Sequence, residues 1–151
     1  MTAAVDPAVV IRLFGSKEAL FAAVAADAFN FGPAFALPLH ELAQAIATHL
    51  VDDAAPDHCP PDFDTFRFLL HSAASPIAAP ILSASMHAGF VAPLAVHLGG
   101  EAGEARAALF VSIILGISTL RFGLRSPPLE AAPRDLLIQR LAAALQACLE
   151  G

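Results

Sequence analysis

The chain has 151 residues, a length that most often forms one domain or a small domain with an appendage. Hydrophobic residues make up 57% and charged residues 15% of the chain, and Ala and Leu dominate, so we expect an all-α protein that hides apolar surface at a subunit interface. The net charge of -6 excludes a protein that coats nucleic acid with clustered Lys and Arg, although a small basic patch remains compatible with it.

The N-terminal part of the sequence predicts two helices joined by a tight turn. Asp6-Pro7 has the signature of a helix start, because Asp caps free amides and Pro loses no hydrogen bond at the first helical position. Gly15 ends this short helix, and Ser16 caps a second helix that extends to about Asn30.

A third helix is predicted after Gly32-Pro33. Its apolar residues recur at intervals of three and four, which places it at roughly Pro38 to Val51. The stretch from Asp52 to Asp64 holds three prolines and five aspartates, and we interpret it as a loop.

The rest of the chain predicts four further helices, over residues 63–72, 75–97, 101–125 and 133–149. Ser75-Pro76 begins the second of these, and Pro93 is a candidate kink within it. Gly99-Gly100 breaks the chain, and Pro127-Pro128 stops the following helix. No segment alternates polar and apolar residues as a strand does, so the sequence predicts seven helices, six of good length and one short.

The apolar segments do not indicate a membrane protein. The longest apolar stretch, Ala107 to Leu120, falls short of the roughly 20 residues that a spanning helix needs, so we interpret it as a buried helix. The N-terminus lacks the pattern of a secretory signal. We therefore expect a cytoplasmic location and no membrane partner.

Catalytic and metal-binding patterns are also missing from the sequence. Cys59 and Cys148 are isolated thiols, and the six histidines do not repeat the spacing of a helical metal site. Ser83-Ala84-Ser85 lacks the surroundings of a nucleophile elbow, and no Gly-rich phosphate loop follows a strand. We expect no metal, no cofactor and no enzyme activity.

The segment from Val5 to Phe21, VDPAVVIRLFGSKEALF, resembles the recognition-helix end of the DNA-binding domains of the TetR family. The residues that match the motif of that family are Val5, Asp6, Pro7, Val10, Phe14, Gly15, Ser16, Lys17, Glu18 and Leu20. The chain from Arg67 to its end is similar, with looser motifs, to the ligand-binding and dimerisation region of one group of these regulators.

The resemblance implies a ligand-responsive transcriptional regulator, expected to be a repressor, that forms a homodimer and binds DNA and a small hydrophobic effector. It divides the chain into a partial helix-turn-helix head over residues 1–32 and a helical ligand-binding and dimerisation domain over residues 33–151. Residues Thr2 to Val5 alone precede the recognition helix here, so we expect an incomplete head. Two alternatives stay open: a dimeric small-molecule-binding or protein-interaction module that has lost DNA binding, and a start codon upstream of Met1.

The resemblance also suggests three groups of site residues. The DNA contacts are expected at Asp6, Arg12, Ser16 and Lys17. The effector pocket is expected at His71, Met86, His87 and Arg121, with solvent-facing or internally paired side chains as the alternative. A four-helix dimer interface is expected at Ile113, Gly116, Leu120, Leu137, Leu141 and Leu145, with burial inside one subunit as the alternative.

Overall fold

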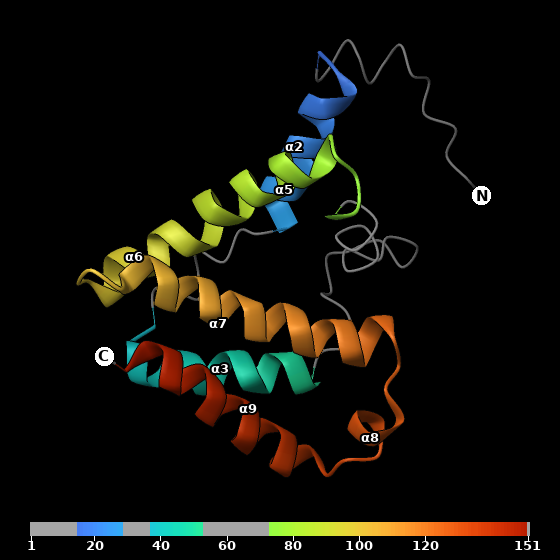
Figure 1. Cartoon of the computed structure of the whole chain (residues 1–151). Coiled ribbons are helices and arrows are strands. Elements are labelled where there is room, and N and C mark those ends of the chain that lie inside the picture. Colours follow the sequence, from blue (N-terminus) through green and yellow to red (C-terminus); the bar gives the residue numbers. More distant parts are fainter. Residues whose placement is uncertain (1–14, 29–36, 53–72, 151) are drawn as a thin grey trace.

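A computed structural model describes residues 15–28, 37–52 and 73–150, and every regular element in these ranges is helical (Figure 1). The elements are α2 (Lys17–Ala28), α3 (Leu39–Asp52), α5 (Ala78–Met86), η2 (His87–Val91), α6 (Ala92–Leu98), α7 (Gly103–Ser118), η3 (Thr119–Gly123), α8 (Pro127–Glu130) and α9 (Arg134–Leu149). The predicted all-α fold class is confirmed. The helices expected at residues 6–14 and 63–72 lie outside the described residues.

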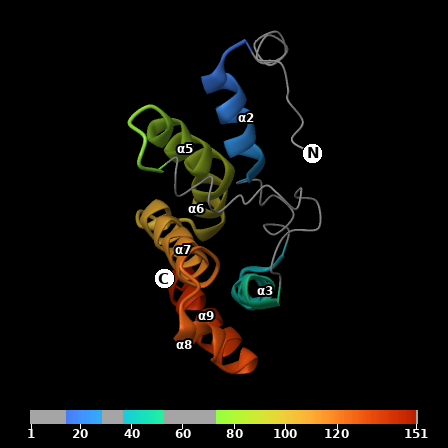
Figure 2. The same ribbon diagram turned by 90° about the vertical axis from the view of Figure 1, so that its right-hand side faces the viewer.

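The body of the molecule is built from α3, α7 and α9. Helices α7 and α9 run side by side, and α3 lies behind them (Figures 1 and 2). The continuous helix formed by α5, η2 and α6 crosses above this group, and α2 packs on α5. The largest fully buried side chains are Leu42, Phe90, Leu94, Phe110 and Leu145. The core therefore lies where α3, η2, α6, α7 and α9 meet.

Local signals in the sequence set several helix ends correctly. Gly15 has a φ of 83°, and the Ser16 hydroxyl accepts a 3.0 Å hydrogen bond from the Ala19 amide at the start of α2. Ser75 accepts one of 3.2 Å from the Ala78 amide at the start of α5. The predicted break between α6 and α7 contains two glycines of positive φ, 62° at Gly99 and 72° at Gly100.

The predicted kink at Pro93 takes the form of a π-helical turn. Pro93 has no amide hydrogen for the Gly89 carbonyl, and in an α-helix its ring would press on that carbonyl. The turn η2 ends at Val91, two residues before Pro93, and there the Ala92 amide bonds to the His87 carbonyl, five residues back. The helix widens by one residue at this point and continues as α6.

The C-terminal end of α7 widens in the same way. The Thr119 hydroxyl donates a 2.6 Å hydrogen bond to the Leu115 carbonyl, and the π-helical turn η3 begins at Thr119. The sequence predicts that Pro127-Pro128 stops the preceding helix, which is only one of its two roles. The pair also begins the one-turn helix α8, because proline suits the first turn of a helix.

The length argument against membrane-spanning helices needs correction. Because α5 continues through η2 and α7 through η3, two stretches of 21 residues, Ala78–Leu98 and Gly103–Gly123, are long and apolar enough to cross a membrane by length and composition alone. Core helices pass the same test, so it is weak evidence for a span. Each of the two stretches contributes buried residues to the protein core, such as Leu94 and Phe110.

Candidate functional site

The residues expected to contact DNA fall at the edge of the described chain. Asp6 and Arg12 lie outside the described residues, as does the side chain of Lys17. Lys17 is the first residue of α2, so its backbone lies at the positive end of the helix dipole. The Ser16 hydroxyl caps the same helix end. The geometry next to the motif is therefore that of a capped helix N-terminus, a place that suits an anion.

The residues expected in the effector pocket are not brought together. The His87 ring nitrogen Nε2 lies 3.8 Å from Glu104 Oε1, in the first turn of α7. Arg121 lies beyond the other end of α7, a helix of 16 residues whose ends are about 24 Å apart. Met86 is half-buried against the core, and His71 lies outside the described residues.

Arg121 is an internally paired residue, the alternative left open by the sequence. One guanidinium nitrogen donates a 2.6 Å hydrogen bond to the Leu50 carbonyl in the last turn of α3, and the guanidinium carbon lies 5.4 Å from the Phe122 ring centre. Arg106 acts similarly on α9, donating to the Cys148 carbonyl at 3.1 Å and to the Leu149 carbonyl. Both arginines thus satisfy carbonyls at helix C-termini, where positive charge is favourable.

A groove of about 740 Å³ lies between α2 on one side and α5 with the turn η2 on the other. Its lining consists almost entirely of small or apolar side chains: Ala22, Ala26, Pro80, Ile81, Ala84, Ser85, Ala88 and Gly89. Ser85 supplies the one hydroxyl in this lining. None of the motifs or candidate residues predicted from the sequence lies in this groove. The run of small residues on both helices could have indicated it, because Ala and Gly leave space where helices cross.

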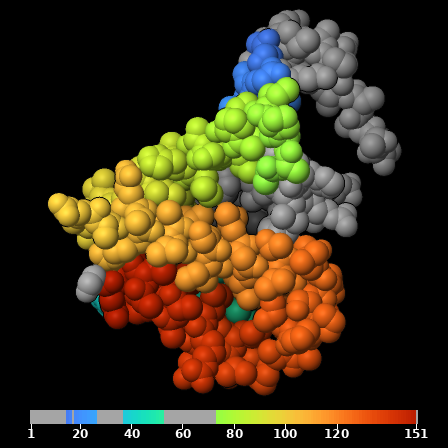
Figure 3. Space-filling model, in the orientation of Figure 1, coloured from blue at the N-terminus to red at the C-terminus, as the bar shows by residue number. Residues whose placement is uncertain are grey.

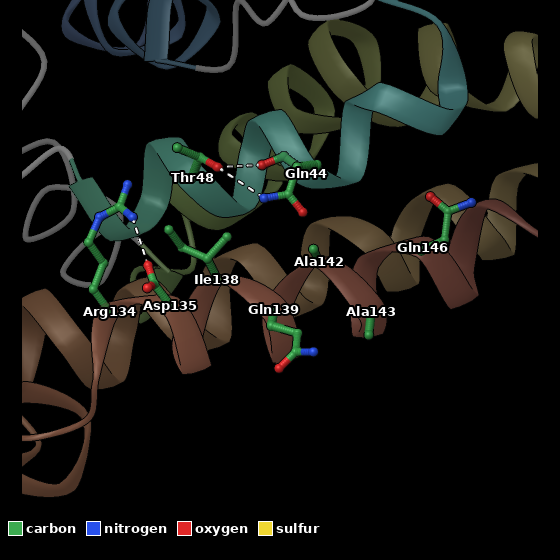
Figure 4. A pocket seen from close by; sticks show the side chains of 9 residues that line it. All are labelled: Gln44, Thr48, Arg134, Asp135, Ile138, Gln139, Ala142, Ala143 and Gln146. Atoms are coloured by element: carbon green, nitrogen blue, oxygen red, sulfur yellow. Dashed lines mark hydrogen bonds and ion pairs between the residues drawn. The ribbon is translucent and has the colours of Figure 1, made fainter.

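A second groove, of about 660 Å³, lies between α3 and α9, and its lining combines polar residues with Ile138, Ala142 and Ala143 (Figure 4). Ile138 and Ala142 lie between the two helices, whereas Gln139 points outward. The Gln44 side chain bonds to Thr48 on α3. At one end, Arg134 donates two 2.6 Å hydrogen bonds to the Asp52 carboxylate.

At this end of the groove, Arg134 forms ion pairs with two neighbouring carboxylates. The hydrogen bonds from Arg134 hold the pKa of Asp52 below its ordinary value of 3.8, and Asp52 in turn raises the pKa of Arg134. A third hydrogen bond, of 3.0 Å, joins Arg134 to Asp135. The guanidinium therefore already has carboxylate partners and is not available as an anion site. Among the described residues, no group of three His, Cys, Asp or Glu side chains could hold a metal ion.

The residues expected at the dimer interface divide between surface and core. Leu145 is fully buried and Leu141 is 8% exposed, so both belong to the core of one subunit. Ile113 and Leu137 are half-buried against that core. Gly116 and Leu120 are exposed. For the two buried leucines the structure thus supports the alternative, burial inside one subunit.

An exposed stripe nevertheless runs along α7 at helical spacing. Leu109, Ser112, Gly116 and Leu120 follow one another at intervals of three and four, so they share one face of the helix, and Leu109 is 59% exposed. We call these four residues the α7 stripe; Leu120 belongs to η3, the continuation of α7. Figure 3 shows α7 and α9 forming one continuous face of the molecule, and α9 contributes the exposed Leu136.

Comparison with known proteins places most of the chain in one family. Residues 40–149 match a family model described as the tetracyclin repressor-like C-terminal domain. The matched range runs from α3 to α9 and so contains the body of the molecule. No curated protein matches the chain.

Proposed function

Since this chain belongs to the TetR family of regulators, we propose that it is a ligand-responsive transcriptional regulator, acting as a repressor in the cytoplasm. The observation that carries this proposal is the family match over residues 40–149, preceded in the sequence by the DNA-binding motif from Val5 to Phe21. Regulators of this family are generally not enzymes, and we propose no catalytic role. We assign the DNA-binding head to residues 1–32 and the effector-binding and dimerisation domain to residues 33–151.

The proposed DNA contacts are made by Asp6, Arg12, Ser16 and Lys17. The described geometry supports this for the last two, because Gly15 turns the chain and Ser16 caps the helix that begins at Lys17. A phosphate placed there would meet free backbone amides, the positive end of the helix dipole and a lysine. Lys17 is the one lysine of the sequence, which makes its contribution separable.

Selection from a pool of random duplexes tests DNA binding directly. The full reading frame, including any codons upstream of Met1, should enrich a sequence with two related half-sites, as a symmetric dimer requires. Replacement Lys17→Ala should weaken binding to all duplexes and lower the salt dependence by about one phosphate contact. Arg125→Ala is the matched control, because Arg125 is exposed beside α8 and pairs with Glu130.

Two results would count against the regulator. If no sequence is enriched by any length of the chain while effector binding persists, the protein is a binding module that has lost DNA recognition. If Lys17→Ala and Arg125→Ala weaken binding equally, the attraction is general electrostatics and the assignment of Lys17 fails.

We propose that the effector is a small hydrophobic compound bound in the groove between α2 and α5. The lining supports this choice, since it is apolar with a single hydroxyl, a combination typical of small-molecule sites. The groove also touches α2, the helix whose first residues, from Lys17 to Phe21, end the DNA-binding motif. Replacement Ala84→Phe should fill it and abolish thermal stabilisation by apolar ligands, whereas Ala45→Phe, at an exposed position on α3, should not.

We also propose that two copies of the chain associate through the face made by α7 and α9. The α7 stripe supports this, because it leaves Leu109 and Leu120 59% and 46% exposed on one subunit. Ser112 and Gly116 lie between them and would allow close approach of a second helix.

A further inference from the structure

The long helix that contains α5, η2 and α6 changes its packing partners at the π-helical turn. Within the described chain, no residue of α5 is buried, whereas Phe90, Val91 and Leu94 are. Helix α2 packs principally on α5, while η2 and α6 pack on α7. The boundary between the α2–α5 pair and the body of the protein therefore falls inside one continuous helix, at η2.

The same turn is the weakest part of that helix in hydrogen bonding and composition. Pro93 gives no amide hydrogen to the turn before it, and the Ala92 amide reaches back to the His87 carbonyl instead of the Ala88 carbonyl. Gly89, inside the turn, belongs to the residue type that loses most conformational freedom in a helix. A helix bends most readily at a site of this kind.

Buried side-chain contacts hold the turn only at its last two residues, Phe90 and Val91. His87 approaches Glu104 of α7 at 3.8 Å, and the two side chains are 55% and 75% exposed. An ion pair so accessible to water contributes little to holding two elements together. The buried anchors, Phe90 and Leu94, lie at the end of the turn and beyond it, on the side of the body. Phe90 packs near Phe110 of α7 with ring centres 6.1 Å apart.

We propose that the π-helical turn η2 is a hinge through which the α2–α5 pair moves relative to the body. Closing the turn into α-helix would rotate α5 by about 100° and shift it by about 1.5 Å relative to α6. Ala88 and Gly89 of the turn also line the apolar groove, so a compound bound there would contact the hinge. The idea that this hinge transmits effector binding from the groove to the DNA-binding head rests on the proposed function. The motion itself does not rest on it.

Distances between paired spin labels test the hinge on the full chain without DNA or effector. One label replaces Ala23, exposed on α2, and the other Ala45, exposed on α3, after Cys59→Ser and Cys148→Ala remove the native thiols. The reference pair joins Ala45 to Ala108, exposed on α7, so that both labels lie in the body. Dilution with unlabelled protein removes distances between subunits. We expect a broad distance distribution for the first pair and a narrow one for the reference pair.

Removing the hinge should make the two distributions alike. Pro93→Ala combined with deletion of Ala88 takes out both the proline and the extra residue of the π turn, so the helix continues with α5 and α6 in their present register. The distribution between α2 and α3 should narrow to the width of the reference pair. Pro80→Ala is the control, because it removes a proline from the first turn of α5, away from η2.

Hydrogen exchange gives a second measurement that does not depend on the deletion variant. Pro93→Ala alone should slow exchange of the amides of η2 by about two- to tenfold, the factor that corresponds to one added backbone hydrogen bond. Pro80→Ala should leave it unchanged. The hinge is disproved if the wild-type distribution between α2 and α3 is already as narrow as the reference. It is also disproved if the combined variant leaves that distribution broad and Pro93→Ala leaves hydrogen exchange of η2 unchanged. Loss of DNA binding in other tests would leave these results intact.

Discussion

At the scale of single residues, the sequence predicts what depends on near neighbours. Ser16 and Ser75 cap helices as expected, because a cap needs only amides two or three residues away, and Gly15 has a positive φ. The roles of Arg106 and Arg121 were not predictable in this way. Each bonds to a carbonyl that is 42 or more residues distant in the chain, and no local pattern encodes such a partner.

The pair Asp52 and Arg134 leads to a prediction about pH. The folded-state pKa of Asp52 lies below 3.8 because Arg134 bonds to its ionised form, so the stabilisation is present above about pH 4 and is lost as the pH falls through the folded-state value. Asp52→Asn should therefore lower the urea midpoint modestly at neutral pH and have no effect in strong acid. Unfolding curves at several pH values measure this difference.

A matched variant shows whether the effect belongs to the pair. Arg134→Gln should cause at least the same loss at neutral pH, because it also removes the hydrogen bond to Asp135. The double variant should lose less stability than the sum of the two single losses, since both single variants break the pair between Asp52 and Arg134. A constant difference between wild type and Asp52→Asn down to strong acid would contradict the assignment of the lowered pKa to this pair.

At the scale of elements, the sequence predicts the helices and their ends but not the widened turns. Helices α3 and α9, and α7 taken together with η3, lie within two residues of the predicted ranges, because apolar periodicity and Gly or Pro boundaries are local signals. Pro93 indicated a kink, and the structure resolves it as a π turn. The choice between a bend and an added residue depends on how Phe90 and Leu94 pack on α7, which is tertiary information.

The crossing of α6 and α7 gives a prediction at this scale. A Cβ atom on Gly103 would lie 3.0 Å from the Ala95 carbonyl oxygen, a backbone atom of the neighbouring helix that has little freedom to move. Gly103→Ala should therefore lower the free energy of unfolding by about 1–3 kcal/mol, as overpacking does. Thermal or urea unfolding measures it.

The same substitution at Gly116 is the control within one helix. No atom lies within 4 Å of a Cβ built there, so Gly116→Ala meets open space in a single subunit and should gain up to about 1 kcal/mol from helix propensity. The measurement belongs at a concentration low enough for subunits to be separate. Equal stability changes for the two variants would show that the contact with Ala95 is not tight.

At the scale of the whole molecule, family and fold class could be predicted, but the division between surface and core could not. Leu141 and Leu145 share a helical stripe with Leu137, and the sequence does not tell whether that stripe faces its own subunit or another. The structure shows that α9 turns it toward the core. The apolar groove was missed for a similar reason, because residues of α2 and α5 meet only after the chain has folded.

The exposed side of α7 leads to the last prediction, on association of two copies. In a two-fold interface each substitution occurs twice, once on either subunit, so one charged residue on the α7 stripe brings two charges into the contact. Leu120→Glu should weaken association by at least about 30-fold, the effect of losing a central apolar contact of about 2 kcal/mol. Wild type should sediment with twice the 15.6 kDa mass of one chain, and Leu120→Glu with a single chain mass at the same concentration.

Ile77→Glu is the control, since Ile77 is 67% exposed at the start of α5, away from this face. A wild-type protein that sediments as one chain, or equal masses for the two variants, would place the interface elsewhere. Because α7 also anchors η2 and α6, a dimer built on this face would fix the bodies of two subunits together and leave the α2–α5 pairs as the parts able to change their separation.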